Sequence, residues 1–319
     1  MSGKRYAYSF EQGDGKNKML LGGKGAKLCE MTQIGINVPP GFTLATEACL
    51  AYLAENRLPE GLMEEVRTHI AGVERKTGKS FGGATNPLLV SVRSGSAMSM
   101  PGMMDTILNL GLNDQTLAGL AAATKNARFA YDAWRRFIQL FGKIALGVPD
   151  EKFDRAMTGL KRKVGAAEDV DLSADHLKQL AATYLAIVRE ATGKPFPTDP
   201  VEQLEIAIGA VFRSWMGKRA VDYRRQFRIT PDMANGTAVN IVAMVFGNLG
   251  DDSATGVGFT RNPGTGENVI YGDYLVNAQG EDVVAGIRTP KPIAEMAHEM
   301  PGLYRELVEL RDKLESHYR

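Results

Sequence analysis

The sequence predicts an α+β fold in which a first lobe of mixed helices and strands is followed by a helical insertion and a second, β-rich lobe. Of the 35 glycines, 6 lie in residues 113–198, so the middle of the chain favours helices. This middle repeats apolar side chains at helical spacing, whereas the flanks carry short β-forming runs broken by Gly or Pro. The predicted organisation is a first α/β lobe over residues 1–112, the helical insertion over 113–198, and a second β-rich lobe over 199–319.

The first lobe alternates helices with strands. Apolar periodicity predicts its helices, and short runs of Val, Ile, Leu and Thr between Gly and Pro predict its strands. In chain order we expect a helix over 25–31, a strand over 41–45, helices over 46–56 and 60–76, and strands over 88–92 and 106–110.

The insertion contains two well-defined amphipathic helices. Ser173 can cap the second of them at its start, and Gly193 with Pro195 ends it. The apolar face of the first carries Ala130, Trp134, Phe137, Ile138, Phe141 and Ile144, and that of the second carries Leu177, Leu180, Ala181, Tyr184 and Val188.

The second lobe opens with a helix and continues with strands. Asp199 and Glu202 have capping-box spacing with Pro200 in the first turn, and Gly217 is expected to close the helix. Its apolar face carries Leu204, Ile208, Val211, Phe212 and Trp215, and strands are expected over 238–246, 256–260 and 268–276.

The composition excludes several classes of protein. The 319 residues are 44% hydrophobic with a net charge of +1, without the basic excess typical of proteins that bind duplexes or membrane surfaces. No signal core or membrane-length apolar run is present. Cys29 and Cys49 lack C-x-x-C spacing and are interpreted as buried thiols in a reducing compartment. We therefore expect a cytoplasmic protein with no nucleic-acid or membrane partner, while a local basic pocket remains possible.

Two familiar phosphate-binding motifs are incomplete. The triplet Gly78-Lys79-Ser80 resembles the end of a Walker A loop, but Val73 occupies the position that requires glycine. The Gly-x-Gly pairs at 256–258 and 264–266 lack the third glycine of a dinucleotide-binding loop. Both pairs are interpreted as turns.

A third glycine-rich segment is a better phosphate-binding candidate. Residues 20–27 read LLGGKGAK, so that Lys24 lies just before the helix expected from Gly25. Backbone N–H groups at a helix start together with an ammonium can bind phosphate. The alternative is a flexible turn with a solvated lysine, and Lys27, one turn later, is interpreted as an exposed helix charge.

Arg93 lies at the end of the apolar strand expected over 88–92. A guanidinium can bind two phosphate oxygens at once, although a structural ion pair is an equally good interpretation. The loop that follows contains Ser94, Gly95, Ser96 and Ser99 and then the residues MPGMMDT at 100–106. Hydroxyls, backbone amides and flexible apolar cover in one loop are typical of a lid that excludes water from a ligand.

Other polar residues give weaker signals. Asp273 and Glu281 could each help to bind a cation, but a structural acid at a strand end is favoured for both. The histidines are scattered without a catalytic spacing to a carboxylate or Cys, and we assign them no role: His69, His176, His298 and His317.

Several segments in one order resemble the N-terminal nucleotide-binding region of the pyruvate, phosphate dikinase family, and the resemblance spans essentially the whole chain. The matching segments are LLGGKGAKLCEM, PPGFTLATEAC, LLVSVRSGSAMSMPGMMDTILNLGLN, RFAYDAWRRFIQLF, AVFRSW with AVDYRR, TAVNIVAMVFGN and GVGFTRNPGTGENVIYGDYLVNAQGEDVVAGIRTP. The resemblance implies an ATP-grasp-like fold, in which two lobes hold ATP between them.

The resemblance also implies the ATP contacts. Lys24 and Arg93 would contact the phosphates, the loop from Gly102 would close over them, and adenine would lie against the backbone of the strand over 240–246. The family usually has glutamine at position 242, where this chain has valine, and valine cannot supply the polar side-chain contact near adenine that glutamine would make. The implied ATP-binding residues are Lys24, Arg93, Gly102, Met103, Asp105, Thr106, Val242 and Met244.

In the family, ATP and Mg²⁺ take part in a phosphoryl transfer that has three steps. The β,γ-pyrophosphoryl group passes to a histidine on a separate domain, inorganic phosphate takes the γ-phosphoryl group, and the phosphohistidine converts pyruvate to phosphoenolpyruvate. The resemblance therefore implies ATP, Mg²⁺, pyruvate and phosphate as cofactor and substrates, and a homo-oligomeric full-length enzyme.

The family's later motifs do not occur in these 319 residues: the Asp-x-Glu pair that holds Mg²⁺, the Gln-x-Arg strand, and the Thr-Ser-His phosphohistidine segment. We therefore expect no catalytic residue in this chain, an incomplete metal site, and a fragment without net dikinase activity. One alternative is a non-catalytic nucleotide-binding or interaction module. The other is a fragment of a phosphoenolpyruvate synthase, and the segment SMPGMMDTILNLGLN disfavours this second alternative.

Overall fold

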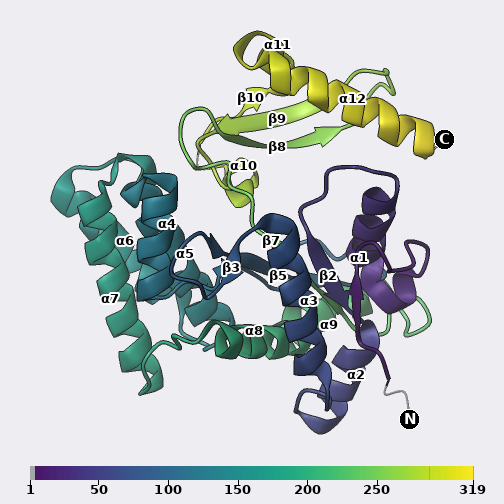
Figure 1. The fold of residues 1–319 in the computed structure, drawn as a ribbon, viewed down its shortest axis with the longest axis horizontal. Coiled ribbons are helices and arrows are strands. Elements are labelled where there is room, and N and C mark those ends of the chain that lie inside the picture. Colours follow the sequence, from purple (N-terminus) through teal and green to yellow (C-terminus); the bar gives the residue numbers. More distant parts are fainter. Residues whose placement is uncertain (1–3, 287, 319) are drawn as a thin grey trace. The chain divides into compact units, whose positions relative to one another are not determined.

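The structure is a computed structural model that describes residues 4–286 and 288–318. The chain forms two compact units, Met1–Met244 and Val245–Arg319, and each is described by itself (Figure 1). No described helix is both long enough and apolar enough to cross a membrane.

A five-stranded sheet in the order β1-β2-β7-β5-β6 forms the centre of the first unit. Each neighbouring pair is antiparallel. A separate two-stranded parallel pair is formed by β3 (Ser80–Phe81) and β4 (Pro87–Leu88). The five strands are β1 (Ala7–Ser9), β2 (Gly41–Leu44), β5 (Val90–Gly95), β6 (Thr106–Leu110) and β7 (Ala238–Ala243).

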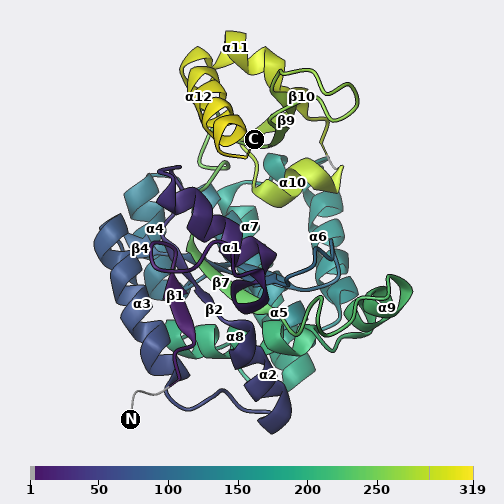
Figure 2. The ribbon, with the colours of Figure 1, turned by 90° about the vertical axis from the view of Figure 1, so that its right-hand side faces the viewer.

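Helices cover the sheet of the first unit (Figure 2). Helix α1 (Lys18–Gln33) packs against β2, β5 and β7, and α8 (Pro200–Ser214) packs against β5, β6 and β7. Two further helices complete this part: α2 (Thr46–Glu55), which contacts β7 and α8, and α3 (Leu62–Thr77), which contacts β1 and β2.

The helical insertion follows β6, and its helix α5 packs on that strand and on α7. Ser173 caps α7, accepting a hydrogen bond from His176 N–H, and Gly193 ends the helix in the left-handed conformation, as the sequence predicts. The helices of this region are α4 (Asp114–Thr124), α5 (Ala127–Ile144), α6 (Asp150–Val164), the 3₁₀ turn η1 (Asp169–Asp171) and α7 (Ala174–Thr192).

The second unit is a three-stranded antiparallel sheet in the order β10-β9-β8. Tyr274, Ile293 and Met296 form its buried cluster, against which Tyr304 and Leu307 of the last helix pack. Its elements are β8 (Ala254–Phe259), β9 (Tyr271–Val276), α10 (Gly280–Ala285), β10 (Lys291–Pro292), the 3₁₀ turn η2 (Ile293–Glu295), α11 (Met296–Glu299) and α12 (Pro301–His317).

The structure confirms the six predicted strands and differs from the sequence prediction at two helices. Helix α1 begins at Lys18, seven residues earlier than predicted, and contains a break. The helix after Asp199 ends at Ser214, and Gly217 instead precedes α9 (Lys218–Gln226). The Asp199 side chain caps α8 by accepting from Val201 N–H.

The predicted lobe boundary at residue 199 also differs from the division in the structure, which falls after Met244. The reason is strand pairing. Strand β7, which the prediction assigned to the second lobe, hydrogen-bonds between β2 and β5 at the centre of the first unit's sheet.

Candidate functional site

The glycine-rich segment before Lys24 lies directly against the end of β5. Gly22 breaks α1 with φ 68° and ψ 163°, a conformation that is essentially restricted to glycine. A Cβ atom on Gly22 would lie 1.9 Å from Gly95 O, and Gly23 N–H donates to Ser96 O at 2.8 Å. The break therefore holds the start of the following helical segment against the residues after β5.

Lys24 projects from this break towards the end of β5. Its Nζ donates to Ser94 O at 3.1 Å. Burial of the ammonium, together with the nearby Arg93 charge, lowers the pKa of Lys24 to about 8, because both effects disfavour the charged form. The residue as a whole is exposed, while its ammonium is held against Ser94 O.

Arg93 lies in a row of polar side chains that crosses the sheet. It pairs with Asn240 on β7 and with Thr106 on β6, and Asn240 pairs in turn with Thr43 on β2. Directly paired residues of antiparallel strands share a face of the sheet. A Cβ on Gly25 would lie 2.8 Å from both Thr43 and Asn240, so this row, including Arg93, faces α1.

Arg93 is exposed and forms no ion pair with any residue in the described ranges. Lys24 likewise has no carboxylate partner there. The structure therefore brings together the two cations that the sequence predicts to bind phosphate, and neither is neutralised by the protein in the part of the chain that is described.

The predicted loop connects β5 to β6 and contains a tight turn over residues 100–103. Met103 N–H donates to Met100 O at 3.2 Å, and Gly102 has φ 70°. Ser94 N–H donates to Asp105 O at 3.4 Å, which places Asp105 beside the residue that holds Lys24. The turn residues named by the sequence, Gly102, Met103, Asp105 and Thr106, thus lie at the end of the strand pair that carries Arg93.

A buried polar network beneath the site was not predicted. Thr43 Oγ1 donates to Asn240 Oδ1 at 2.9 Å, and Asn240 Nδ2 donates to Arg93 O at 3.4 Å. Thr237 Oγ1 accepts from Gly95 N–H at 3.1 Å. The signal in the sequence was the polar residue within the apolar run AVNIVA. Buried polar groups that are satisfied in this way fix the strand end on which Arg93 lies.

One buried polar group at the site lacks a partner. Ser96 is 6% exposed, and its Oγ forms no hydrogen bond within the described residues. Its carbonyl oxygen receives Gly23 N–H, so the residue lies beside the break before Lys24. Buried hydroxyls normally have a partner, which makes this one a candidate ligand contact.

The residues predicted to contact adenine are engaged in the core. The Val242 side chain is buried in an apolar cluster with Phe10, Leu21, Ala26 and Cys29. Met244 N–H donates to Leu89 O at 2.9 Å. Neither the valine side chain nor the Met244 amide is therefore presented to a ligand, in contrast to the row around Arg93.

The described residues do not form a cation site around the two acids that the sequence suggested as weaker candidates. Asp273 lies exposed on β9, and the side chain of Glu281 lies outside the described residues. Among the described residues there is no group of three His, Cys, Asp or Glu side chains that could hold a metal ion. Cys29 and Cys49 are buried free thiols, as predicted, and burial raises the pKa of each to about 11.

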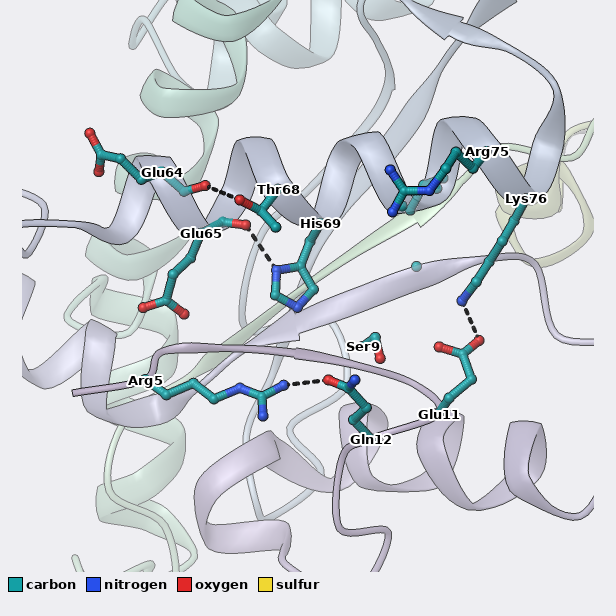
Figure 3. A pocket seen from close by; sticks show the side chains of 13 residues that line it. Arg5, Ser9, Glu11, Gln12, Glu64, Glu65, Thr68, His69, Arg75 and Lys76 are labelled. Atoms are coloured by element: carbon teal, nitrogen blue, oxygen red, sulfur yellow. Dashed lines mark hydrogen bonds and ion pairs between the residues drawn. The ribbon is translucent and has the colours of Figure 1, made fainter. Parts of the chain in front are cut away.

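A groove of about 780 Å³ lies elsewhere, between α3 and the segment around β1 (Figure 3). It contains none of the predicted site residues. Lys76 and Glu11 form an ion pair of 2.6 Å across it, and Arg5 donates to Gln12 Oε1 at 2.7 Å. Two of its carboxylates already have partners, because Glu11 pairs with Lys76 and Glu65 accepts hydrogen bonds from the N–H groups of Tyr6 and Ala7.

Comparison with known proteins identifies the family. The model of the family described as "Pyruvate phosphate dikinase, AMP/ATP-binding domain" matches residues 18–68 and 57–316. The chain belongs to this family. The matched region contains Lys24, Arg93 and the turn at 100–106, so the site described above lies within the family's nucleotide-binding domain.

Three relatives show the extent of the similarity. The chain is 61% identical to pyruvate, phosphate dikinase of Entamoeba histolytica, 54% identical to the chloroplastic dikinase 1 of Arabidopsis thaliana, and 50% identical to the dikinase of Clostridium symbiosum. The alignments cover 97–99% of this chain but 32–36% of the relatives. The chain thus spans about a third of the length of these dikinases, and identity to dikinases disfavours the phosphoenolpyruvate synthase alternative.

Proposed function

We propose that this chain binds the phosphate groups of ATP at Lys24, Arg93 and the turn over 100–106. The observation that carries the proposal is the convergence of two cations that have no carboxylate partner in the described ranges. Lys24 Nζ lies 3.1 Å from Ser94 O, and the pKa of Lys24 responds to the Arg93 charge. Holding the positive charges of Lys24 and Arg93 close together costs electrostatic free energy, and a bound polyphosphate removes that cost.

Each group of the site makes a different proposed contact with the phosphates. The Arg93 guanidinium binds two phosphate oxygens in parallel, and the Lys24 ammonium neutralises charge on a neighbouring oxygen. The unpartnered Ser96 hydroxyl donates to a further oxygen, and the 100–106 turn covers the phosphates and excludes water. Gly102, Met103, Asp105 and Thr106 contribute through this turn.

The finer assignments follow the family resemblance. We propose an ATP-grasp-like fold, with adenine near Val242 and Met244, although their described contacts offer neither the valine side chain nor the Met244 amide to it. The described residues include no three-ligand metal cluster, so they do not fit a protein-held Mg²⁺ ion. Mg²⁺ is therefore expected to arrive with the nucleotide.

The complete reaction is proposed only for a full-length dikinase that contains this region. Such an enzyme uses ATP, phosphate and pyruvate to form AMP, diphosphate and phosphoenolpyruvate, and self-associates. This chain supplies nucleotide binding and no catalytic residue. A cytoplasmic location is proposed for it, although relatives with chloroplastic forms are known.

Isothermal titration calorimetry of the chain with ATP tests the proposal. R93A should weaken ATP binding at least about tenfold, since a charge-assisted hydrogen bond is worth about 1.5–3 kcal/mol. R67A is the matched control, because Arg67 is an exposed arginine on α3 and should bind ATP as the unmodified chain does. Equal affinities of R93A and R67A would contradict the site. No binding by the unmodified chain would favour an interaction module.

A further inference from the structure

The turn between β5 and β6 is weakly held by its own hairpin. Pro101 and Gly102 are exposed, and the hydrogen bonds within the hairpin at this end are the Met103–Met100 contact of 3.2 Å and the Ser94–Asp105 contact of 3.4 Å. Few contacts and a glycine with positive φ make such a turn mobile on its own. A cover for a ligand therefore needs an additional support.

Arg219 provides that support from a distant part of the sequence. It lies in the first turn of α9, more than 110 residues after the turn. Its Nη1 donates to Gly102 O at 3.2 Å, and its Nη2 donates to Asp105 Oδ1 at 3.0 Å. One planar guanidinium thus bridges two points of the turn, a geometry that the single ammonium of lysine does not reproduce.

Asp105, which Arg219 contacts, is connected to the proposed phosphate contacts. Asp105 O accepts from Ser94 N–H, and Ser94 O accepts from the Lys24 ammonium. Arg93 is adjacent to Ser94 and pairs with Thr106. The position of Asp105, which Arg219 holds, is therefore linked through one residue to both cations.

We infer that Arg219 is a positioning residue that holds the 100–105 turn in place over the phosphates of the bound nucleotide. This inference rests on the proposed function. Arg219 acts through Gly102 O and the Asp105 carboxylate and does not itself contact the nucleotide. Its benefit is preorganisation, because a turn that is already ordered loses less conformational freedom when the ligand binds.

The bridge contributes little to the stability of the fold. The Arg219 side chain is 64% exposed and that of Asp105 is 26% exposed, and exposed ion pairs are typically worth less than about 1 kcal/mol. If the bridge had only a structural role, R219A would therefore change neither the melting temperature nor ATP binding appreciably. If Arg219 positions the turn, R219A weakens ATP binding while the melting temperature stays the same.

Calorimetry with ATP on five variants of the chain tests the inference: R219A, R219K, D105A, the double variant R219A/D105A and R225A. R219A should raise the Kd for ATP about two- to fivefold with an unchanged melting temperature, and R219K should resemble R219A because lysine cannot form the bridge. R219A and D105A should be non-additive when combined, since each removes the same bridge. R225A is the control, because Arg225 lies on the same helix and contacts Asp222 at 3.9 Å instead of the turn.

Three results would overturn the inference: ATP affinity of R219A equal to that of R225A, full rescue by R219K, or additive effects of R219A and D105A. Hydrogen exchange on the ligand-free chain keeps the inference testable if the unmodified chain binds no ATP, a result that refutes the proposed function alone. Faster amide exchange at 102–105 in R219A than in R225A supports the bridge as the support of the turn, and equal exchange refutes it.

Discussion

The ionisation of Lys24 is strongly linked to its place in the structure. Its folded-state pKa of about 8 lies below the ordinary value of 10.5. Between these two values the unfolded chain binds more protons than the folded chain, so the free energy of unfolding rises with pH in that window. Below about pH 8 the folded protein bears the cost of holding the ammonium beside Arg93, which a bound phosphate offsets.

ATP affinity should therefore fall as pH rises through about 8, because Lys24 loses the charge that binds phosphate. We expect a loss approaching tenfold per pH unit above that point, measured by calorimetry between pH 7 and 9.5. K24R is the control, since arginine stays charged throughout and its affinity should change much less over this range. Parallel profiles of the two proteins would show that Lys24 does not bind the phosphates.

The residues of the site were predictable from the sequence to different degrees. Lys24 and Arg93 stand out locally, as a lysine within glycines and an arginine at a strand end. Arg219 does not, and Asn240 is marked locally only as a polar residue within an apolar run, because the roles of both arise from pairing with segments more than 100 residues away. The burial of the Val242 side chain has a related cause, the packing of α1 on β7, which no local pattern reveals.

At the level of elements, the break in α1 decides where Lys24 lies. The sequence predicts a helix only after the glycines, whereas the structure has helical residues on both sides of Gly22. Glycines usually interrupt helices, and the reason for this interruption is a tertiary contact, the approach to Gly95 O. The strands were easier to predict, since their β-branched runs are bounded by Gly and Pro.

G22A should destabilise the first unit and weaken ATP binding together. The alanine Cβ would lie 1.9 Å from Gly95 O, in a backbone conformation that itself costs about 1–3 kcal/mol, so we expect a loss of about 3 kcal/mol or more in the free energy of unfolding. G78A separates the two causes, because Gly78 has φ 65° with no atom within 4 Å of a Cβ.

G78A should cost only about 1 kcal/mol and leave ATP binding unchanged. Urea denaturation and calorimetry measure both quantities. Equal losses of stability in G22A and G78A would mean that the contact with Gly95 does not determine the break.

At the level of the whole molecule, the chain consists of two units with cores of different size. The sheet and helices of the first unit bury many large side chains, whereas the second unit is built on Tyr274, Ile293 and Met296. Small cores support less stability. The sequence predicted two β-rich regions but not their boundary, because β7 belongs by sequence to the later region and by pairing to the first sheet.

Denaturation should therefore proceed in two steps, with residues 245–319 unfolding at lower urea concentration than the rest. Both tryptophans, Trp134 and Trp215, lie in the first unit, so their fluorescence reports that unit alone, whereas far-UV circular dichroism reports both. We expect an early transition in circular dichroism that fluorescence does not show. Coincident curves would indicate a single cooperative unit.

The central claim is that ATP phosphates bind at Lys24, Arg93 and the turn over 100–106. Hydrogen–deuterium exchange with and without ATP tests it most directly, because it locates the ligand along the chain. We predict slower exchange in peptides that cover residues 19–27 and 93–106, and no change in residues 64–76 of α3, which line the groove of Figure 3. Protection confined to residues 64–76, with none at 19–27 and 93–106, would contradict the claim.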